Sequence, residues 1–302
     1  MFLYITSKYI KKLIFISLFF LCYSAKGQSV DLFFGTGSSH FLGDLGGKLF
    51  AGTNDFQDVD FAKTRYGLTA GVRVNFGRYF TLRANGWYAR VAGDDKFTSN
   101  KERRGRNLSF FSPILEGDVL AEINFAKSKN GKGIFYIFGG LGFFTFNPKT
   151  KLNGNTYTLR DYGTEGQFTI AGKSPYALSS ICFPSGIGYK LAVGRKSYLA
   201  FEVNMRKTQT DYIDDVSTNF VDPNLLIAAK GPVAAQLADR NISTIPGFSS
   251  PGSIRGDIKN NDSYFFLAIT YNIRLGIGAG GIGYGGKRRG GRIHGKGRCF
   301  EF

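Results

Sequence analysis

The sequence is poor in histidine, cysteine, methionine and proline, which number two, three, two and eight among its 302 residues. The cysteines stand far apart and show none of the short spacings of a zinc site or a disulfide framework. Beyond the N-terminal segment, no uncharged apolar run reaches the ~18 residues that a transmembrane helix needs. These shortages exclude a disulfide-rich domain, a zinc-finger domain and a helical membrane protein.

Glycine and aromatic residues are abundant instead. The chain has 41 glycines, roughly twice average usage, together with 30 phenylalanines and 16 tyrosines. Disordered chains contain few aromatic residues, so this composition excludes disorder. Many glycines and aromatics, with little of the alanine, leucine and glutamate that helices favour, indicate an all-β protein.

The first 27 residues have the three-part pattern of a secretory signal peptide. A basic start with three lysines precedes an apolar stretch over residues 13–22, and the small side chains of Ala25 and Gly27 fit cleavage before Gln28. The alternative is a buried N-terminal helix. We therefore expect residues 1–27 to be removed and the protein to be exported.

Alternation of apolar and polar side chains dominates the rest of the chain. It is clearest over residues 65–76, where Tyr66 and Leu68 share one face and Thr69 and Arg73 share the other. Side chains of a strand alternate with period two, so this segment predicts a strand with one apolar and one polar face. The same pattern predicts eight strands in all, over residues 30–42, 65–76, 79–91, 108–125, 134–146, 176–191, 197–211 and 263–274.

The connections between these strands alternate between short and long. Along the chain they cover residues 43–63, 77–78, 94–107, 126–133, 147–175, 192–196 and 212–262. This alternation and an even strand number are typical of an outer-membrane barrel with short periplasmic turns and long extracellular loops. A soluble β-sandwich, the alternative, has no reason for the alternation. The expected fold is all-β, an eight-stranded antiparallel transmembrane β-barrel over residues 28–274 with both termini in the periplasm.

Two prolines fall inside predicted strands, where a proline removes a ladder hydrogen bond. Pro113 fits the end of its strand. Pro184 lies well inside its strand, and we expect a bulge there.

Charged residues lie on the polar faces of the predicted strands. These faces must line the lumen, because a charge on the lipid side of a barrel costs ~2–4 kcal/mol at mid-bilayer. Eight strands leave an interior just wide enough for side chains, so charges inside must pair with each other. We expect a salt-bridge network and no open pore; the alternative is a selectivity or proton path. The predicted network consists of Arg73, Arg83, Glu116, Asp118, Glu122, Glu202 and Arg206.

Residues suited to catalysis or to cofactor binding are scarce. His294 lies in the basic tail, which leaves His40, beside Ser38 and Ser39, as the one candidate general base. A Ser–His pair there would suit a lipase or protease at the membrane surface, although an interfacial polar residue is the simpler interpretation. Acidic stretches at residues 211–215 and 257–262 lack the ligand spacing of an EF-hand calcium site. We expect no enzyme activity, no cofactor and no metal site.

Residues 275–302 form a glycine-rich basic tail around Lys287, Arg288, Arg289 and Arg292. The formal net charge is +17, and +13 remains without the four lysines of the signal peptide. Basic runs often bind nucleic acid, but a periplasmic tail meets none, so we expect no nucleic-acid partner. The tail is a candidate contact for an acidic partner, the cell wall or lipid headgroups; the alternative is a solvated tail without a partner.

Five segments in or beside the predicted loops match the sequence pattern of a known protein family. They are Arg106-Asn107-Leu108-Ser109-Phe110, Phe146-Asn147-Pro148-Lys149, Tyr162-Gly163-Thr164-Glu165-Gly166-Gln167, Arg206 to Asp222, and Lys259-Asn260-Asn261-Asp262. In this order and spacing they resemble the PorG-like family of Bacteroidota outer-membrane proteins, over about residues 30–274. The resemblance implies an eight-stranded barrel of the type IX secretion and gliding-motility machinery, in contact with a periplasmic ring of a lipoprotein and its partner. It implies no catalytic residues, and the tail lies outside it.

The expected function is that of a non-enzymatic outer-membrane anchor for this machinery. The barrel would fix depth and orientation, with outer-membrane lipid around it, and its turns, loops or tail would contact the ring. A second hypothesis is a surface barrel for adhesion or envelope integrity that acts through its loops. A third is a lipid-modifying enzyme that uses His40. The sequence leaves open whether the longest loop, 212–262, plugs the barrel mouth.

Overall fold

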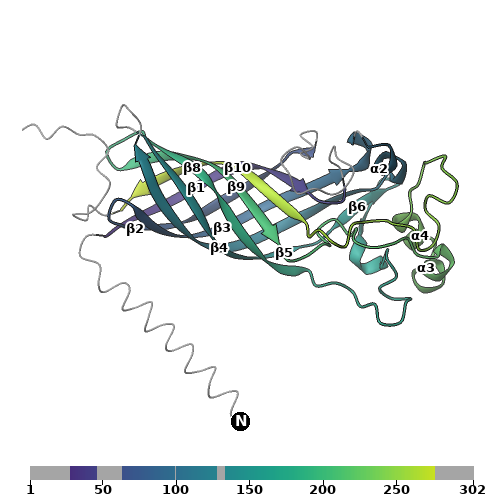
Figure 1. Ribbon diagram of the computed structural model, residues 1–302. Helices are drawn as coiled ribbons and strands as arrows, with labels where there is room; N and C mark the ends of the chain where they lie inside the picture. Colours follow the sequence, from purple (N-terminus) through teal and green to yellow (C-terminus); the bar gives the residue numbers. More distant parts are fainter. Residues whose placement is uncertain (1–27, 46–62, 99, 128–132, 276–302) are drawn as a thin grey trace, which may run out of the picture.

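The computed structural model describes residues 28–45, 63–98, 100–127 and 133–275. Eight long strands form the body of this described part (Figure 1). They are β1 (Gln28–Leu42), β2 (Arg65–Phe76), β3 (Phe80–Asp94), β4 (Ser109–Lys127), β5 (Gly133–Phe146), β8 (Ser179–Ala192), β9 (Ser197–Thr208) and β10 (Ser263–Arg274). The predicted signal peptide, and all of the predicted basic tail except Leu275, lie outside the described residues.

The eight strands close into a barrel because the last strand returns to the first. Each strand pairs antiparallel with the next around the ring β1-β2-β3-β4-β5-β8-β9-β10. β10 then pairs with β1 from Asp31↔Arg274 to Leu42↔Ser263. The predicted eight-stranded antiparallel barrel is confirmed, with strand ends within three residues of those expected.

Short and long connections lie at opposite ends of the barrel (Figure 1). The short-turn end carries the turns 77–79 and 193–196, together with the start of β1 and the end of β10. The long-loop end carries elements that the sequence did not predict: η3 (Asp95–Phe97), α2 (Lys101–Arg106), β6 (Lys149–Leu152), β7 (Asn155–Thr158), η4 (Leu159–Tyr162), α3 (Pro223–Lys230) and α4 (Pro232–Ala238). None of the described helices has the length and apolar character needed to cross a lipid bilayer.

Both prolines are accommodated without a bulge. Pro113 lies just where the pairing of β4 with β5 has ended, but β4 continues beside β3 to Ser109, so the expected strand end at Pro113 is wrong. Pro184 keeps its register with β9, but the ladder between β5 and β8 has no pairs between Gly139↔Ser185 and Gly142↔Cys182. The bulge predicted at Pro184 is therefore wrong. Because proline lacks an N–H, the ladder is interrupted while the register continues across the gap.

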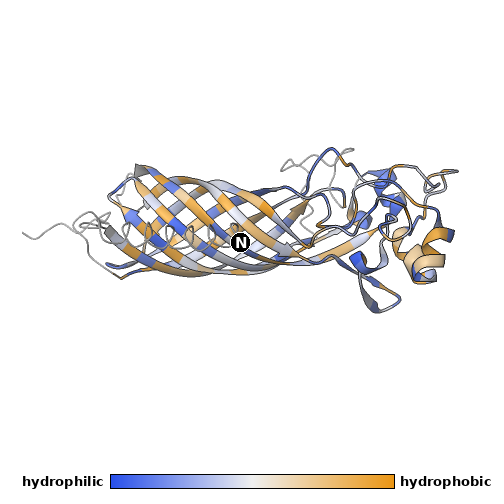
Figure 2. Cartoon of the chain, turned by 90° about the horizontal axis from the view of Figure 1, so that it is seen from below, coloured by the Kyte–Doolittle hydropathy of each residue, from blue (hydrophilic) through white to orange (hydrophobic). Residues whose placement is uncertain are grey.

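The outer wall of the barrel is apolar. On β2, Tyr66 and Leu68 point outward and are 77% and 63% exposed, whereas Thr69 and Arg73 are buried. Figure 2 shows the same alternation of apolar and polar residues along the other strands. Outward apolar residues include Leu115, Val119 and Ile123 on β4, Ile137 and Leu141 on β5, Phe201 on β9 and Leu267 and Ile269 on β10. An apolar wall around a polar interior is the arrangement of a membrane-spanning barrel.

Candidate functional site

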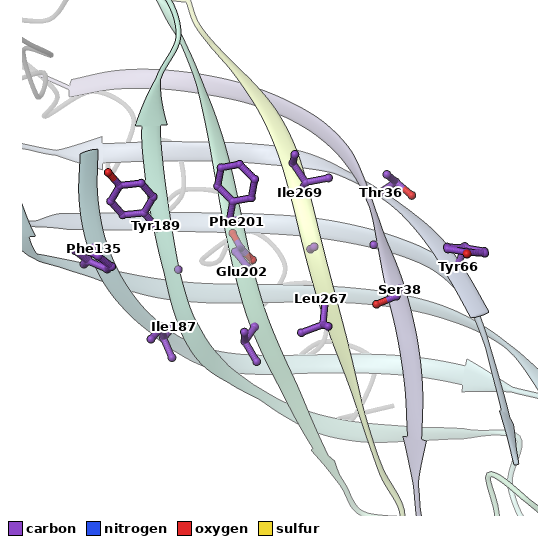
Figure 3. Close-up of a pocket in the computed structure, with 14 residues that line it drawn as sticks. Thr36, Ser38, Tyr66, Phe135, Ile187, Tyr189, Phe201, Glu202, Leu267 and Ile269 are labelled. Atoms are coloured by element: carbon purple, nitrogen blue, oxygen red, sulfur yellow. The ribbon is translucent and has the colours of Figure 1, made fainter. Parts of the chain in front are cut away.

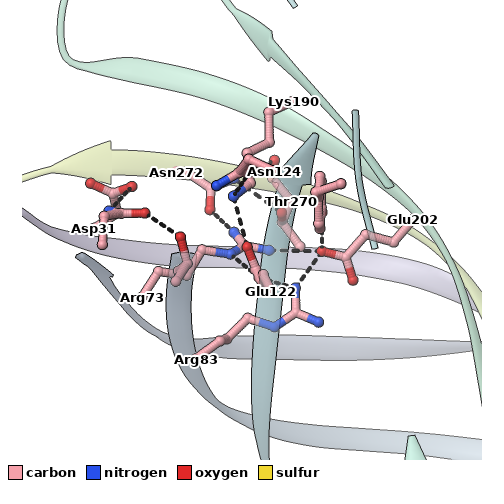
Figure 4. A network of polar contacts seen from close by, with 12 residues as sticks. Asp31, Arg73, Arg83, Glu122, Asn124, Lys190, Glu202, Thr270 and Asn272 are labelled. Carbon is pink, nitrogen blue, oxygen red and sulfur yellow. Dashed lines mark hydrogen bonds and ion pairs between the residues drawn. The ribbon is translucent and has the colours of Figure 1, made fainter. Parts of the chain in front are cut away.

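Charged side chains fill the half of the lumen nearer the short-turn end (Figure 4). Glu202 of β9 accepts hydrogen bonds from Arg73 Nη2 at 2.7 Å and from Arg83 Nη1 at 2.5 Å. The hydroxyl of Tyr136 donates to the same carboxylate at 2.6 Å. Since β3 and β9 lie opposite each other in the ring of strands, the contact between Arg83 and Glu202 crosses the lumen. The side chains of opposite walls thus meet inside the barrel.

Glu122 of β4 is the second acceptor in this part of the lumen. Its carboxylate lies 2.9 Å from Arg73 Nε, 3.1 Å from Arg83 Nη1 and 2.7 Å from Lys190 Nζ. We call Arg73, Arg83, Glu122, Lys190 and Glu202 the polar layer; none of these side chains is more than 2% exposed. Their mutual pairing offsets the large cost of taking isolated charges out of water.

Lys190 and Asp31 belong to the lumen but were not predicted there. Asp31 of β1 accepts a hydrogen bond from the hydroxyl of Tyr198 at 2.8 Å and lies 3.0 Å from Arg274 Nε. Both residues alternate with outward apolar residues of their strands, so period-two reasoning applied to β1 and β8 finds them. Arg65 is half-buried at the long-loop end of β2, where it donates to the carbonyl of Thr64.

The remaining predicted lumen charges form a second group nearer the long-loop end. Arg206 Nη2 lies 3.1 Å from Glu116 and 3.7 Å from Asp118. The hydroxyl of Tyr264 donates to Glu116 at 2.7 Å. The guanidinium of Arg206 also lies 4.3 Å from the ring centroid of Phe266. The structure thus divides the seven predicted residues into the polar layer and this Arg206 group.

An aromatic layer, formed by Trp87, Phe144, Tyr264 and Phe266, closes the lumen beside the Arg206 group. Trp87 and Phe266 stack with their ring centroids 4.2 Å apart. Tyr264 makes edge contacts with Phe144 and Phe266 at 5.5 Å and 5.6 Å. All four rings are buried. They belong to a continuous hydrophobic core that extends out of the barrel into the long loops.

Loop residues cap this aromatic layer. Ile213 and Val216, in the loop after β9, are 0% and 1% exposed and belong to the same core. The backbone N–H of Ile213 donates to the carboxylate of Asp262 at 2.8 Å, which ties the two ends of the longest loop together. We call residues 163–167, 211–218 and 255–262 the cap. Residues of the longest loop thus pack against the aromatic layer; whether the loop plugs the barrel mouth is a point that the sequence left open.

Arg255 holds the cap together from inside. Its Nη1 lies 2.9 Å from Glu165 and donates to the backbone carbonyl of Asp215 at 2.6 Å. Glu165 also accepts hydrogen bonds from the N–H groups of Ser217 and Thr218, at 2.9 Å and 3.0 Å. Arg255 is 2% exposed. One buried cation therefore joins the loop after β5 to the loop after β9.

Besides Glu165 and Asp215, four more buried carboxylates lie in and beside the cap: Asp44, Asp211, Asp214 and Asp262. Burial raises the pKa of Asp44 to about 6 and that of Asp211 to about 9. Burial and the neighbouring acids raise the pKa of Asp214 and Asp262 well above the usual range. Among the described residues, no group of three or more His, Cys, Asp or Glu side chains is arranged to hold a metal ion. Three of the four accept from the loop backbone: Asp214 from the N–H of Val216 at 2.9 Å, Asp44 from that of Asp257 at 2.7 Å and Asp262 from that of Ile213 at 2.8 Å.

Ser38 and His40 lie on the outer wall of β1. His40 Nε2 is 3.0 Å from Ser38 Oγ, close enough for a Ser–His nucleophile. The imidazole is 3% exposed and stacks on Phe265 at 4.6 Å. An acyl-transfer site also needs N–H donors aimed at an oxyanion, whereas β1 is paired with β2 as far as Ser39 and with β10 as far as Leu42. The pair is therefore best explained as structural.

A groove of about 610 Å³ crosses the outer wall over β1, β10, β9 and β8 (Figure 3). Tyr66, Phe201, Leu267 and Ile269 line it, and their side chains are exposed. Its lining is predominantly apolar and lies on the wall that faces lipid, so the groove suits lipid chains.

The four basic residues predicted to contact a partner, Lys287, Arg288, Arg289 and Arg292, lie outside the described residues. That contact stays a prediction.

No protein-family model matches the sequence, and no curated protein matches it. Among solved structures the chain is similar to Ail, the attachment invasion locus protein of Yersinia pestis, with 7% identity over 83% of this chain and 100% of that one and a TM-score of 0.38. It is similar to Neisserial surface protein A, with 8% identity over 82% and 98% and a TM-score of 0.37. It is also similar to the N-terminal β-barrel domain of Pseudomonas aeruginosa OprF, with 9% identity over 82% and 99% and a TM-score of 0.32. Identities this low carry no information on function.

Proposed function

We propose that this chain is a sealed outer-membrane barrel that acts as an anchor, and neither as a pore nor as an enzyme. The observation that carries the proposal is the continuous filling of the lumen. The polar layer, the Arg206 group, the aromatic layer and the cap follow one another from the short-turn end to the long-loop end. Such a barrel offers solutes no path, so its use lies in its fixed position and in the surfaces at its two ends.

The apolar wall and the placement of the chain ends support an outer-membrane location. The wall requires lipid around it, and the signal peptide expected over residues 1–27 directs the chain out of the cytoplasm. Eight strands bring both ends of the barrel, residues 28 and 274, to the same side. We place this short-turn end and the tail 275–302 in the periplasm, and the cap outside the cell.

We assign the barrel to the type IX secretion and gliding machinery, where it would hold a periplasmic ring of a lipoprotein and its partner. Support comes from the positions of the segments that resemble the PorG-like family. Segments 162–167 and 206–222 meet in the cap, where the N–H of Ser217 donates to Glu165. Arg106, from another segment, donates to the backbone carbonyl of Arg255 at 2.5 Å. Segments scattered along the sequence thus build one structural unit.

The proteome of the culture medium tests this proposal. A strain lacking the gene is compared with its parent and with a complemented strain. We expect proteins with type IX sorting domains to disappear from the medium of the deletion strain and to accumulate in its periplasm. Unchanged export would contradict the assignment to the secretion machinery.

Exposed aliphatic residues at the long-loop end favour a second candidate function, adhesion or envelope integrity. Ile242, Ile254 and Ile258 are 65%, 79% and 68% exposed, and exposed apolar surface suits contact with another surface. Under this alternative, replacing these three residues with serine lowers adhesion and leaves export unchanged. A loss of export in that variant would count against it.

A further inference from the structure

The outer wall changes from apolar to basic where β3, β4 and β6 meet at the long-loop end (Figure 1). The apolar part of the wall ends with the exposed side chains of Tyr88 on β3, Leu115 on β4 and Phe143 on β5. Arg90 follows Tyr88 on the same face of β3 and is exposed. Tyrosine and basic residues at the edge of an apolar wall mark the level at which lipid chains meet lipid headgroups. Arg90 therefore lies at the headgroup level.

Two lysines of β6 lie on the same side of the barrel as Arg90. Phe111 of β4 pairs directly with Lys149 of β6, and residues that pair directly across two strands share a face. The guanidinium of Arg90 lies 5.2 Å from the ring centroid of Phe111. Lys151 shares the face of Lys149, because side chains of a strand alternate with period two. Phe111 therefore has one base over its ring and a second base beside it.

These three bases are available to an anion from outside the chain. In the part of the chain that the structure describes, no carboxylate pairs with Arg90, Lys149 or Lys151. Asp94, on the same face of β3, pairs with Lys63 at 2.8 Å. Arginine and lysine donate charge-assisted hydrogen bonds to phosphate oxygens, and an arginine that stacks on a ring keeps its N–H groups for such bonds. We call Arg90, Lys149 and Lys151 the basic rim.

A hollow of about 560 Å³ lies in the lipid-facing wall of the same strands. Its lining includes Gly117 of β4, Leu141 and Phe143 of β5 and Ile181 of β8, and it shares no lining residue with the groove of Figure 3. Gly117 pairs directly with Gly86 of β3, so neither strand has a side chain at this point of the wall. A Cβ atom at Gly117 would have no atom within 4 Å. Packing within the barrel therefore leaves this space open to the lipid.

The basic rim and the hollow are spaced for a single lipid molecule. Arg90 pairs with Pro113 of β4, and Gly117 lies four residues further along that strand, ~13 Å away at ~3.3 Å per residue. Because strands of a membrane barrel tilt by ~35–45°, Gly117 lies ~10 Å deeper in the bilayer than Arg90. One leaflet has ~15 Å of hydrocarbon. A lipid with its phosphate at Arg90 can therefore place a chain in the hollow.

We infer that the basic rim and the hollow bind one phosphorylated lipid of the outer leaflet, with its phosphate on Arg90 and Lys149 and an acyl chain over Gly117. Position and charge identify the occupant: the hollow opens to lipid chains, and phosphate is the anion found at the headgroup level. A lipid held in this way fixes the depth of the barrel in the membrane. The inference rests on the outer-membrane location in the proposed function and is independent of the secretion role.

The test is native mass spectrometry of the full mature chain, released from uncharged detergent micelles after titration with diphosphorylated lipid A. The titration contains about 150 mM salt, which screens exposed charges elsewhere on the chain. Arg90→Gln/Lys149→Gln should bind lipid A at least tenfold more weakly than the wild type. The matched control, Lys101→Gln/Lys259→Gln, removes the same charge from exposed positions of the long loops and should bind normally. Heat-dependent gel mobility confirms that each variant is folded.

A second pair of variants tests the hollow. Gly117→Leu keeps every charge but fills the hollow, so it should weaken binding of lipid A at least threefold. Ala121→Leu adds the same bulk at an exposed position of β4 outside the hollow and should bind normally. Lipid A without its phosphates should bind the wild type at least tenfold more weakly than the diphosphorylated form.

Unchanged binding by the rim variant or by Gly117→Leu overturns the inference, as does an equal loss in either control. Displacement of lipid A by an equal concentration of inorganic phosphate would show a phosphate site without a lipid and would also overturn it. So would equal binding of lipid A with and without its phosphates. These outcomes are separate from the culture-medium proteome, because a barrel that binds lipid A need not support export, and export can be lost without any change in lipid binding.

Discussion

Arg83 on β3 and Glu202 on β9 meet at 2.5 Å inside the lumen, although their strands lie on opposite sides of the barrel. Side chains can bridge this distance because eight strands enclose a narrow interior. Arg73 and Tyr136 donate to the same carboxylate. Three donors from three strands therefore converge on Glu202, which makes this residue central to the stability of the barrel.

Replacement of Glu202 should destabilise the protein strongly. Glu202→Ala leaves the buried guanidinium groups of Arg73 and Arg83 with Glu122 as their one shared carboxylate, and breaking a buried ion pair in this way costs about 3–5 kcal/mol. Urea titration of the barrel in lipid vesicles, followed by gel mobility, measures the loss. Glu102→Ala, at an exposed position of α2, is the matched control and should change stability by less than about 0.5 kcal/mol. Equal urea midpoints for Glu202→Ala and the wild type would contradict the role of Glu202.

The two lumen layers should seal the barrel independently. We expect no channel currents from the wild type in planar bilayers. The double variant Arg83→Ala/Glu202→Ala opens the polar layer but keeps the stack of Trp87 on Phe266, so it should also stay silent. Adding Trp87→Ala should produce current steps. Steady conductance by the folded wild type would show that the lumen is not sealed.

The cap should loosen as the pH rises. Burial raises the pKa of Asp211 to about 9, and that of Asp44 and Asp215 to about 6, from an ordinary value of 3.8. Between the ordinary and the raised pKa the folded cap binds more protons than the opened one. The stabilising contribution of these groups is therefore complete below the ordinary pKa and is lost as the pH rises through the folded pKa.

Trp87, the single tryptophan of the chain, lies under the cap and reports this change. Quenching of its fluorescence by acrylamide should increase between about pH 5 and about pH 9. Asp211→Asn removes the group with the pKa of about 9 and should flatten the upper part of the curve. Quenching that decreases with rising pH would contradict the account.

Loss of Arg255 should release the cap and leave the barrel closed. Arg255→Ala removes the cation that joins Glu165 to the loop after β9, so the long loops should become sensitive to a protease added to intact cells. Lys259→Ala, at an exposed position of the same loop, is the control and should behave as the wild type. Gel mobility of the barrel should be the same in both variants. Loops as resistant as those of the wild type would show that Arg255 does not hold the cap.

The barrel could be predicted because apolar and polar residues alternate along strands such as β2, so the sequence shows which side chains face outward and which face inward. The same alternation placed Arg73, Glu122 and Glu202 on the inner face. It did not predict which of these charged side chains pair with each other across the lumen. Lys190 was missed because β8 contains Pro184 and two glycines, which make the alternation of apolar and polar residues harder to recognise. Which side chains pair across the lumen depends on the order of the strands around the barrel and on the shear of the barrel. Neither can be determined from a single sequence.

The cap could not be predicted, because its contacts join residues far apart in sequence. Glu165 and Arg255 are separated by 90 positions, and nothing near either residue signals the other. The hairpin of β6 and β7 did carry a local signal. Asn153 and Gly154 both have positive φ, 51° and 82°, and Asn-Gly is the preferred pair for a two-residue hairpin turn. Its four-residue strands are too short for alternation to be read.

Complementation tests most directly the central claim, that the barrel acts as an anchor through its short-turn end. A deletion strain receives either the full gene or a version in which two glycines replace residues 221–251. The N–H of Gly252 donates to the carbonyl of Phe220 at 2.8 Å, so the cut ends already lie side by side. We predict that both versions return proteins with type IX sorting domains to the culture medium. Export that never depended on the gene, or that returns only with the full loop, would contradict the claim.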